Sequence, residues 1–330
     1  MEQDLLVIKD LCTQFKTDRG VFPAVSGLDI TIRKGEILCI VGESGSGKTV
    51  ASLSLMQLLP SSGSIASGQI RFEGTDLLKL KKKEIGQIRG KSIAMIFQDP
   101  MVALDPVFTC GSQIVEAIRI HDKRSYAAAR ERTLELLKLV GIAHPERVFD
   151  AYPHELSGGM CQRIMIAMAL SCNPKLLIAD EPTTALDVTV QAQILELLKR
   201  IRDELGMSIM LITHDLGVVA EMADRVAVMY AGKIMEVGDA RTVFKQPQHP
   251  YTQGLLKSIP HLDREGERLY SISGSVPSIS AMPEGCRFAP RCPHAAELCR
   301  RREPQMIAGD GGCFVRCWML DQAWEEEEAG

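Results

Sequence analysis

"GESGSGKT", residues Gly42–Thr49, is the stretch that decides the fold. It matches G-x-x-x-x-G-K-[ST] at every fixed position, after the apolar run "ILCIVG" and before the helical pattern "KTVASLSLMQLL". Between a strand and a helix, the glycines turn consecutive backbone N–H groups toward phosphates, and the helix N-terminus adds positive potential. Lys48 then reaches the β- and γ-phosphates, and the Thr49 hydroxyl is a ligand for Mg²⁺. The candidate nucleotide-binding residues of the loop are Gly42, Glu43, Ser44, Gly45, Ser46, Gly47, Lys48 and Thr49.

A second acidic motif completes this site. In "LLIADE" an apolar run ends at Asp180 and Glu181, so both carboxylates stand at the end of a buried strand. We expect Asp180 to reach the Mg²⁺ shell and Glu181 to polarise an attacking water.

The arrangement of strands and helices predicts an α/β fold with a largely parallel sheet. Through about residue 240, short apolar runs such as "SIAMIF", "KLLIAD" and "SIMLIT" alternate with helical patterns. The clearest helix is predicted over Thr189–Leu205, with its apolar residues on one face, and a hairpin is predicted around Ala231-Gly232. Residues 100–172 carry long helical patterns without a strand, which predicts a helical insertion. A Gly/Ser/Pro-rich stretch, Ser271 to Pro283, is typical of a linker.

Composition excludes several classes of protein. The 330 residues carry a net charge of −4 and no basic stripe, which disfavours nucleic-acid binding. The N-terminus "MEQDLLVIKD" lacks the pattern of a secretory signal, and no apolar run is long enough to span a bilayer. The cysteines are therefore expected as metal ligands or buried apolar side chains rather than disulfides.

The motif "LSGGM", Leu156 to Met160, separates the classes of phosphate-loop protein, which include kinases, GTPases, helicases and transporter ATPases. Ser157 stands as the N-cap of a predicted helix, and Gly158 and Gly159 leave its backbone open, so the motif is a second candidate anion site. Two such sites serve one nucleotide when two chains face each other head to tail. On these motifs and their order, the sequence resembles the ATP-binding-cassette (ABC) transporter ATPases along its whole length.

The resemblance implies a P-loop NTPase fold with a RecA-like core, an antiparallel β subdomain and a helical subdomain. It implies that two cassettes enclose two ATP molecules, each between one chain's phosphate loop and the other's signature motif. Gln98 in "IFQDP" would sense Mg²⁺ and couple to a permease, and His214 in "LITHD" would contact the γ-phosphate. Asp187, at the end of "ALD", would line the dimer interface.

Two positions depart from the family pattern or blur it. Phe15 is the expected adenine-stacking aromatic, with Phe22 as the alternative because "KTDRGVFP" obscures the register. Met160 stands where many family members have glutamine, which predicts a weakened partner site.

The C-terminal sequence indicates the branch of the family. "QHPYTQGLL", followed by clustered cysteines, is similar to the extension of cassettes that power oligopeptide, dipeptide and nickel importers. The resemblance implies a second, non-identical cassette, two permeases and an external solute-binding protein as partners, with this chain at the cytoplasmic face of the membrane. The predicted domains are residues 1–240, the ABC ATPase with its helical subdomain at about 100–172, and 241–330, the extension with cysteines between 286 and 317.

The clustered cysteines resemble a [4Fe–4S] site of this branch. Thiolates suit Fe–S clusters or Zn²⁺, and the spacing lacks the close pairs common in zinc fingers. The expected ligands are Cys286, Cys292, Cys299 and Cys317, with Cys313 competing for the fourth position. Zinc and unligated thiols are the alternatives.

Two other functions stay open at this point. One is a soluble, non-transport ABC ATPase, which the absence of a second cassette and of coiled-coil insertions disfavours. The other is a regulatory cassette that binds ATP without hydrolysing it, which Glu181 disfavours.

Overall fold

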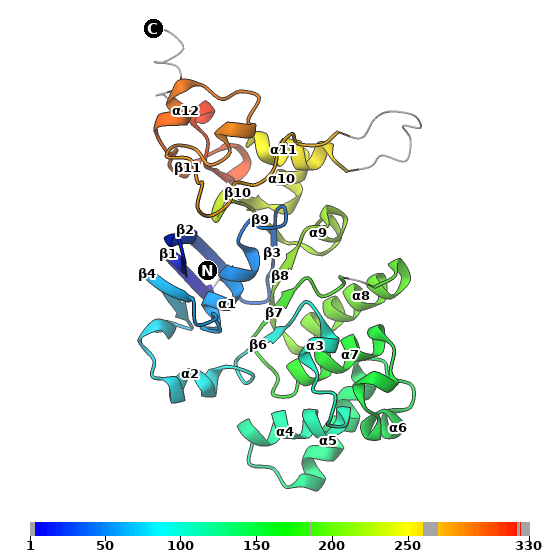
Figure 1. Cartoon of the computed structure of the whole chain (residues 1–330). Coiled ribbons are helices and arrows are strands. Elements are labelled where there is room, and N and C mark those ends of the chain that lie inside the picture. Colours follow the sequence, from blue (N-terminus) through cyan, green and yellow to red (C-terminus); the bar gives the residue numbers. More distant parts are fainter. Residues whose placement is uncertain (1–3, 185, 260–269, 322–323, 325–330) are drawn as a thin grey trace. The chain divides into compact units, whose positions relative to one another are not determined.

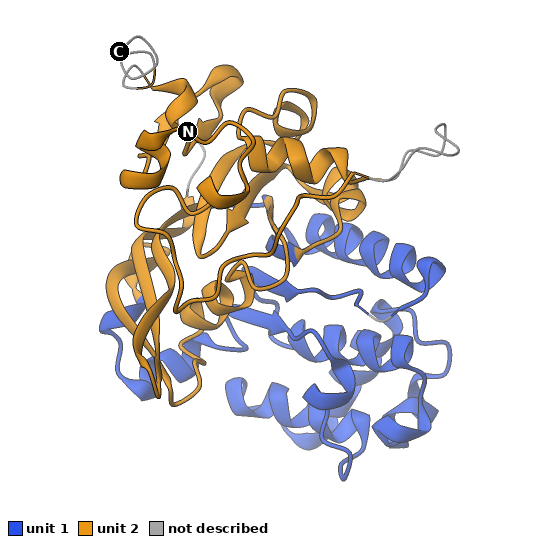
Figure 2. Ribbon diagram, turned by 45° about the horizontal axis from the view of Figure 1, so that its top comes forward, with its two compact units in different colours: residues 1–3, 32–36, 77–212 blue, residues 4–31, 37–76, 213–330 orange. Residues whose placement is uncertain are grey.

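The computed structural model describes residues 4–184, 186–259, 270–321 and 324 (Figure 1). The described chain forms two compact units, which Figure 2 shows in separate colours. We call the unit of residues 32–36 and 77–212 the helical unit, and that of residues 4–31, 37–76 and 213 onward the loop unit. The ends of the predicted domains, residues 1–3 and 325–330, and Ala185 of the "ALD" motif lie outside the described residues.

The loop unit contains an antiparallel sheet built on two long strands. Its order is β2-β1-β4-β5, with β1 Asp4–Thr17, β2 Gly20–Arg33, β4 Gly63–Phe72 and β5 Thr75–Asp76. The pairing of β1 with β4 runs from Leu6 opposite Phe72 to Phe15 opposite Gly63, with irregular register between Lys9 and Thr13. The strand β4 is not predictable from its sequence, because "GSIASGQIRF" has few apolar residues and only its end is buried.

A second group of strands in this unit carries the phosphate loop. In the order β11-β12-β10-β9-β3, the strands are β11 Ile307–Ala308, β12 Phe314–Val315, β10 Lys233–Asp239, β9 Arg225–Tyr230 and β3 Ile37–Val41. β3 is entirely buried, pairs in parallel with β9, and leads through residues 42–47 into α1 Lys48–Leu55. The predicted hairpin around Ala231-Gly232 is confirmed, because β9 and β10 pair antiparallel on either side of it. The remaining helices are α9 Leu216–Met222, α10 Ala240–Lys245, α11 Pro250–Lys257 and α12 Glu297–Arg301.

The helical unit contains three parallel strands and most of the helices. The strands β6 Ile93–Ile96, β7 Leu176–Asp180 and β8 Ser208–Thr213 lie in the order β6-β7-β8, with β8 ending at the unit boundary. α8 Val188–Leu205 confirms the predicted amphipathic helix, since Ile194, Leu198 and Ile201 are buried along one face. The stretch predicted to be helical holds α3 Pro100–Ala103, α4 Cys110–His121, α5 Tyr126–Leu139, α6 Pro145–Asp150 and α7 Gly158–Ala169; α2 Lys82–Ile88 precedes it.

Short 3₁₀ turns connect several of these elements. They lie at Leu77–Lys79, Pro153–Glu155, Ala289–Arg291, Asp310–Gly312 and Trp318–Leu320. Across the residues that the structure describes, no helix combines the length and apolar character needed to cross a bilayer.

Candidate functional site

Two positions of the phosphate loop, Gly42 and Gly47, accommodate glycine but not a residue with a side chain. Gly47, the N-cap of α1, has a φ of 98°, in the left-handed region that glycine adopts without strain. A Cβ atom on Gly42 would lie 2.0 Å from the carbonyl oxygen of Met229, so a side chain there would require the strand to move. The side chain of Lys48 extends back over the loop, and its Nζ donates to the carbonyl oxygens of Gly42 at 2.7 Å and Glu43 at 3.1 Å.

The middle of the loop is held from the β9–β10 hairpin and fits an oxyanion. The N–H of Gly232 donates to the carbonyl oxygen of Ser46 at 2.7 Å. Ser46 is buried, and its Oγ has no hydrogen-bond partner among the described residues. A buried hydroxyl without a partner is costly, and a phosphate oxygen would satisfy it.

The predicted adenine-stacking residue lies on a strand that contacts the helix after the loop. Thr13 Oγ1 of β1 and Ser54 Oγ of α1 are 2.8 Å apart and both side chains are buried. Phe15 follows two residues later on the same face of β1, since side chains alternate along a strand. Phe22 lies on β2.

In the helical unit, the structure brings two predicted catalytic residues together. Gln98 follows β6, Glu181 follows β7, and Gln98 Nε2 donates to Glu181 Oε2 at 3.0 Å. Thr184 Oγ1 donates to the same oxygen at 3.0 Å. Asp180, the last residue of β7, is buried.

Glu181 has a constrained backbone. Its φ is 48°, in a region that residues other than glycine rarely adopt, and its N–H donates to the carbonyl oxygen of Ile212 at 2.8 Å. The position of the Glu181 carboxylate is therefore fixed by a hydrogen bond of the main chain and by two hydrogen bonds to the side chain.

The signature residues begin α7, as the sequence predicts. Ser157 is the N-cap, and its Oγ accepts from the N–H of Met160 at 3.4 Å. A Cβ atom on Gly158 would meet nothing within 4 Å, whereas one on Gly159 would lie 2.9 Å from Val190 Cγ1 of α8. Asp187 caps α8, its carboxylate accepting from the N–H of Val190 at 2.9 Å.

His214 follows β8 and is exposed. The next residue, Asp215, caps α9 through the N–H groups of Gly217 at 2.8 Å and Val218 at 3.3 Å.

The predicted nucleotide-binding residues are divided between the units. The phosphate loop, Phe15 and His214 belong to the loop unit, while Gln98, Asp180, Glu181, Asp187 and the signature residues belong to the helical unit. Their assembly around one nucleotide stays a prediction.

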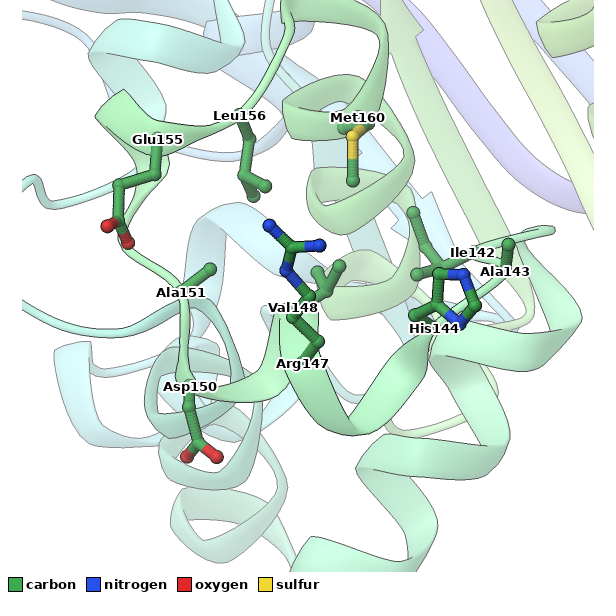
Figure 3. Close-up of a pocket in the computed structure, with 10 residues that line it drawn as sticks. All are labelled: Ile142, Ala143, His144, Arg147, Val148, Asp150, Ala151, Glu155, Leu156 and Met160. Carbon is green, nitrogen blue, oxygen red and sulfur yellow. The ribbon is translucent and has the colours of Figure 1, made fainter.

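A cavity of about 480 Å³ lies beside the signature helix in the helical unit. Figure 3 shows Arg147 pointing toward Leu156 and Met160, with Glu155 and Asp150 to one side and His144 to the other. Met160, which departs from the family pattern, therefore lines this cavity of the helical unit.

The four expected cysteine ligands line one small cavity in the loop unit. Cys286, Cys292, Cys299 and Cys317 share it with His249, His294, Phe288 and Trp318. Cys313 is absent from this lining; a Cβ atom on Gly238 of β10 would lie 2.3 Å from its Sγ.

The predicted iron–sulfur cluster is not supported by this arrangement. The cavity measures about 10 Å³, which is space for one water molecule. Among the described residues, no group of three or more His, Cys, Asp or Glu side chains is placed to hold a metal ion. Burial raises the pKa of the Cys286 thiol to about 11 and that of Cys317 to about 12, so both thiols are neutral while no metal is bound. The residues in this arrangement therefore do not fit a four-iron cluster. The volume of the cavity cannot be predicted from the spacing of the cysteines in the sequence.

Three residues of these sites were missed in the sequence. Thr184 has a recognisable signal, a hydroxyl three residues after Glu181. Tyr251 and Arg291 both bond to Glu43 of the phosphate loop, from more than 200 positions along the chain. Tyr251 lies in the motif "QHPYTQGLL", but no local pattern connects either residue with Glu43.

The glycine loop between β3 and α1, the acid-ended strand β7 and the capped helix α7 together define an ATPase of the ATP-binding-cassette type. Comparison with known proteins agrees. The sequence model described as "ABC transporter" matches residues 25–184, and that described as "Oligopeptide/dipeptide transporter, C-terminal region" matches residues 235–299.

Individual relatives extend the match over the full chain. The oligopeptide transport ATP-binding protein AppD of Bacillus subtilis (strain 168) is 50% identical over 98% of this chain and 99% of AppD. The dipeptide transport ATP-binding protein DppD of Haemophilus influenzae is 53% identical over 92% of each chain. A dimeric structure of the ATP-binding cassette MJ0796 bound to ADP and Pi has a TM-score of 0.65 and 28% identity, covering 72% of this chain and 99% of that one. The chain belongs to the ABC transporter family.

Proposed function

We propose that this chain hydrolyses ATP to power the import of peptides across the cytoplasmic membrane. The contact of Gln98 with Glu181 at 3.0 Å carries the hydrolytic part of the proposal. Full-length similarity to oligopeptide and dipeptide transport ATP-binding proteins carries the choice of cargo. We retain residues 1–240 as the ATPase domain and 241–330 as its extension.

The proposed roles follow from the chemistry of each group. The backbone N–H groups of residues 42–49 and the ammonium of Lys48 bind the phosphates, while Phe15 stacks on the adenine. Thr49, Gln98 and Asp180 supply the hydroxyl, amide and carboxylate oxygens that Mg²⁺ prefers. When bound, Mg²⁺ neutralises charge on the β- and γ-phosphates.

Glu181 is the proposed general base. Its carboxylate is oriented by Gln98 and Thr184, so it is held ready to accept a proton from the attacking water. His214 is proposed to contact the γ-phosphate. Ser157, Gly158 and Gly159 are proposed to complete the site of a second cassette, with Asp187 at the interface between the two.

A group of exposed apolar side chains is the proposed docking site for a permease. We call Phe97, Met101, Val102, Val107 and Phe108 the apolar patch; all five are exposed, and Val102 is 82% exposed. The patch begins directly before Gln98, which donates a hydrogen bond to the carboxylate of Glu181. A permease bound to the patch would therefore contact the segment that carries Gln98. Its occupant would be a permease loop with apolar side chains, because burying this surface stabilises the contact.

The docking proposal is tested with Val102→Asp/Phe108→Asp in the assembled transporter. We expect peptide uptake to fall at least tenfold while ATP affinity stays within about twofold of wild type. Ile120→Asp, at the other end of α4 and also exposed, is the matched control and should transport normally. Normal uptake by the double variant would refute the docking site.

The cargo is tested by uptake in cells that lack the gene and are complemented with wild type or Glu181→Gln. Labelled di- and oligopeptides should enter only with wild type. Uptake of nickel instead of peptides would identify the other importer of this branch. Unchanged uptake of both would favour a non-transport ATPase.

The metal content of the cysteine-lined cavity can be tested directly. The four cysteines share one cavity, but its volume does not fit the predicted [4Fe–4S] cluster, so the cluster and its alternative, Zn²⁺, are tested chemically. Anaerobic purification followed by iron, sulfide and zinc analysis decides between them. Protein that contains neither metal leaves the thiols as buried apolar side chains.

A further inference from the structure

One residue of the phosphate loop, Glu43, is held by side chains from the C-terminal part of the loop unit. Its N–H donates to Tyr251 Oη at 2.9 Å. Its carboxylate accepts from Arg291 Nη1 at 2.6 Å and Nη2 at 3.0 Å, a two-pronged ion pair. The carbonyl oxygen of Glu43 accepts from Lys48 Nζ, so the same residue also contacts the phosphate-binding lysine.

Arg291 is fixed in place by further contacts. Its side chain is only 4% exposed. Nε donates to the carbonyl oxygen of Ser273 at 2.8 Å, and Nη2 donates to that of Ile272 at 3.1 Å. The guanidinium also lies 5.7 Å from the centre of the Tyr230 ring. A planar fork with five N–H groups satisfies these partners together, which a lysine does not.

The aromatic layer behind the ion pair is closely packed. Phe288 lies edge-on to Tyr230 and tilted to Tyr251, with ring centres 5.3 Å apart in both pairs. Tyr230 and Tyr251 are themselves 4.7 Å apart. Arg291 and Tyr251 therefore reach the loop from a rigid, buried support.

A second arginine holds the other side of the loop. Arg287 donates to the carbonyl oxygen of Ala231 and, at 2.8 Å, to Ser26 Oγ. Ala231 precedes Gly232, whose N–H holds Ser46 of the phosphate loop. The segment 286–292 thus supports the loop at Glu43 directly and at Ser46 through the hairpin.

Electrostatics give this support a function. Glu43 places a negative charge in a loop that binds a polyanion, and an unpaired carboxylate there repels phosphate. Arg291 neutralises this charge through its two contacts with the carboxylate. We propose that Arg291 and Tyr251 are positioning residues for ATP, which set the affinity of the phosphate loop by holding Glu43. This inference depends on ATP binding by the family and not on the peptide cargo.

The test measures the dissociation constant for ATP and the rate of hydrolysis on the full-length chain. Arg291→Met removes the ion pair and leaves the Glu43 charge, so we expect ATP affinity to fall about tenfold with kcat within about twofold of wild type. Tyr251→Phe removes the acceptor of the Glu43 N–H, and we expect a fall of about threefold. Arg301→Met is the matched control; Arg301 pairs with Glu297 in an exposed helical turn, and its loss should change neither quantity.

The decisive variant is Arg291→Met combined with Glu43→Gln. Removing the unpaired carboxylate should restore ATP affinity to within about threefold of wild type, because repulsion is the cause of the loss. A merely structural arginine would not be rescued by this change. If Arg291→Met fails to fold, Arg291→Lys keeps the charge and most of the volume, and its affinity should fall about threefold.

Unchanged ATP affinity in a folded Arg291 variant would overturn the proposal, as would a double variant no better than Arg291→Met. Loss of peptide uptake with normal ATP affinity would bear on the proposed cargo alone.

Discussion

Replacing Glu181 by glutamine separates ATP binding from hydrolysis. The carboxylate oxygen Oε2 accepts from Gln98 Nε2 and Thr184 Oγ1, both at 3.0 Å. Glutamine has the same shape and keeps an oxygen that accepts both hydrogen bonds. The substitution therefore removes the charge and the basicity while it leaves the geometry in place.

The expected magnitudes differ for the two steps. A positioned general base contributes about 10²- to 10⁴-fold to a rate, which corresponds to a barrier higher by about 2.7–5.4 kcal/mol. The two hydrogen bonds become neutral rather than charge-assisted, at a cost of about 1 kcal/mol each at most. We therefore expect kcat to fall at least a hundredfold, with a much smaller change in ATP affinity.

The assay is phosphate release at saturating ATP, with ATP binding measured in parallel. Size-exclusion chromatography in ATP and Mg²⁺ should show an accumulating dimer of the variant. Glu204→Gln, an exposed residue paired with Arg200 on α8, is the control and should keep the wild-type rate. A Glu181→Gln protein with more than a tenth of the wild-type kcat would refute the assignment of the base.

Two other substitutions test the loop unit. Gly42→Ala places a Cβ atom 2.0 Å from the carbonyl oxygen of Met229, so we expect loss of ATP binding by fluorescence titration; Gly86→Ala, with nothing within 4 Å, should be tolerated. Complete burial lowers the pKa of His249 to about 3 from its ordinary 6.5. Between these pH values the unfolded chain binds a proton at His249 that the folded chain does not. The free energy of unfolding is therefore highest above pH 6.5, and it falls by up to about 1.4 kcal/mol per pH unit on acidification. His249→Asn, which retains a side-chain acceptor at the start of α11, should flatten this dependence in urea unfolding between pH 6.5 and 4; an unchanged slope would contradict the assignment.

Local sequence determined the elements that carry the chemistry. A short apolar run that is buried throughout, five residues long in β3 and four residues long before Asp180 in β7, needs no distant partner to be recognised. The loop after β3 is equally local, because its glycines and Lys48 act within one turn of chain. The N-cap Ser157 bonds to the N–H group of Met160, three residues away, so its position is also predictable from the local sequence. Asp187 caps α8 in the same way, a role that the sequence analysis did not assign to it.

Tertiary structure alone decided what holds the loop and what the cysteines enclose. Arg291 and Glu43 are 248 positions apart, and nothing near either residue indicates the other. Resemblance to a branch of the family predicts a cluster site at four cysteines, yet the cavity that they line has space for one water molecule. The physical reason is the same in both cases. A motif fixes which groups are present along the chain, whereas the distances and volumes between groups far apart in sequence depend on how the whole unit packs.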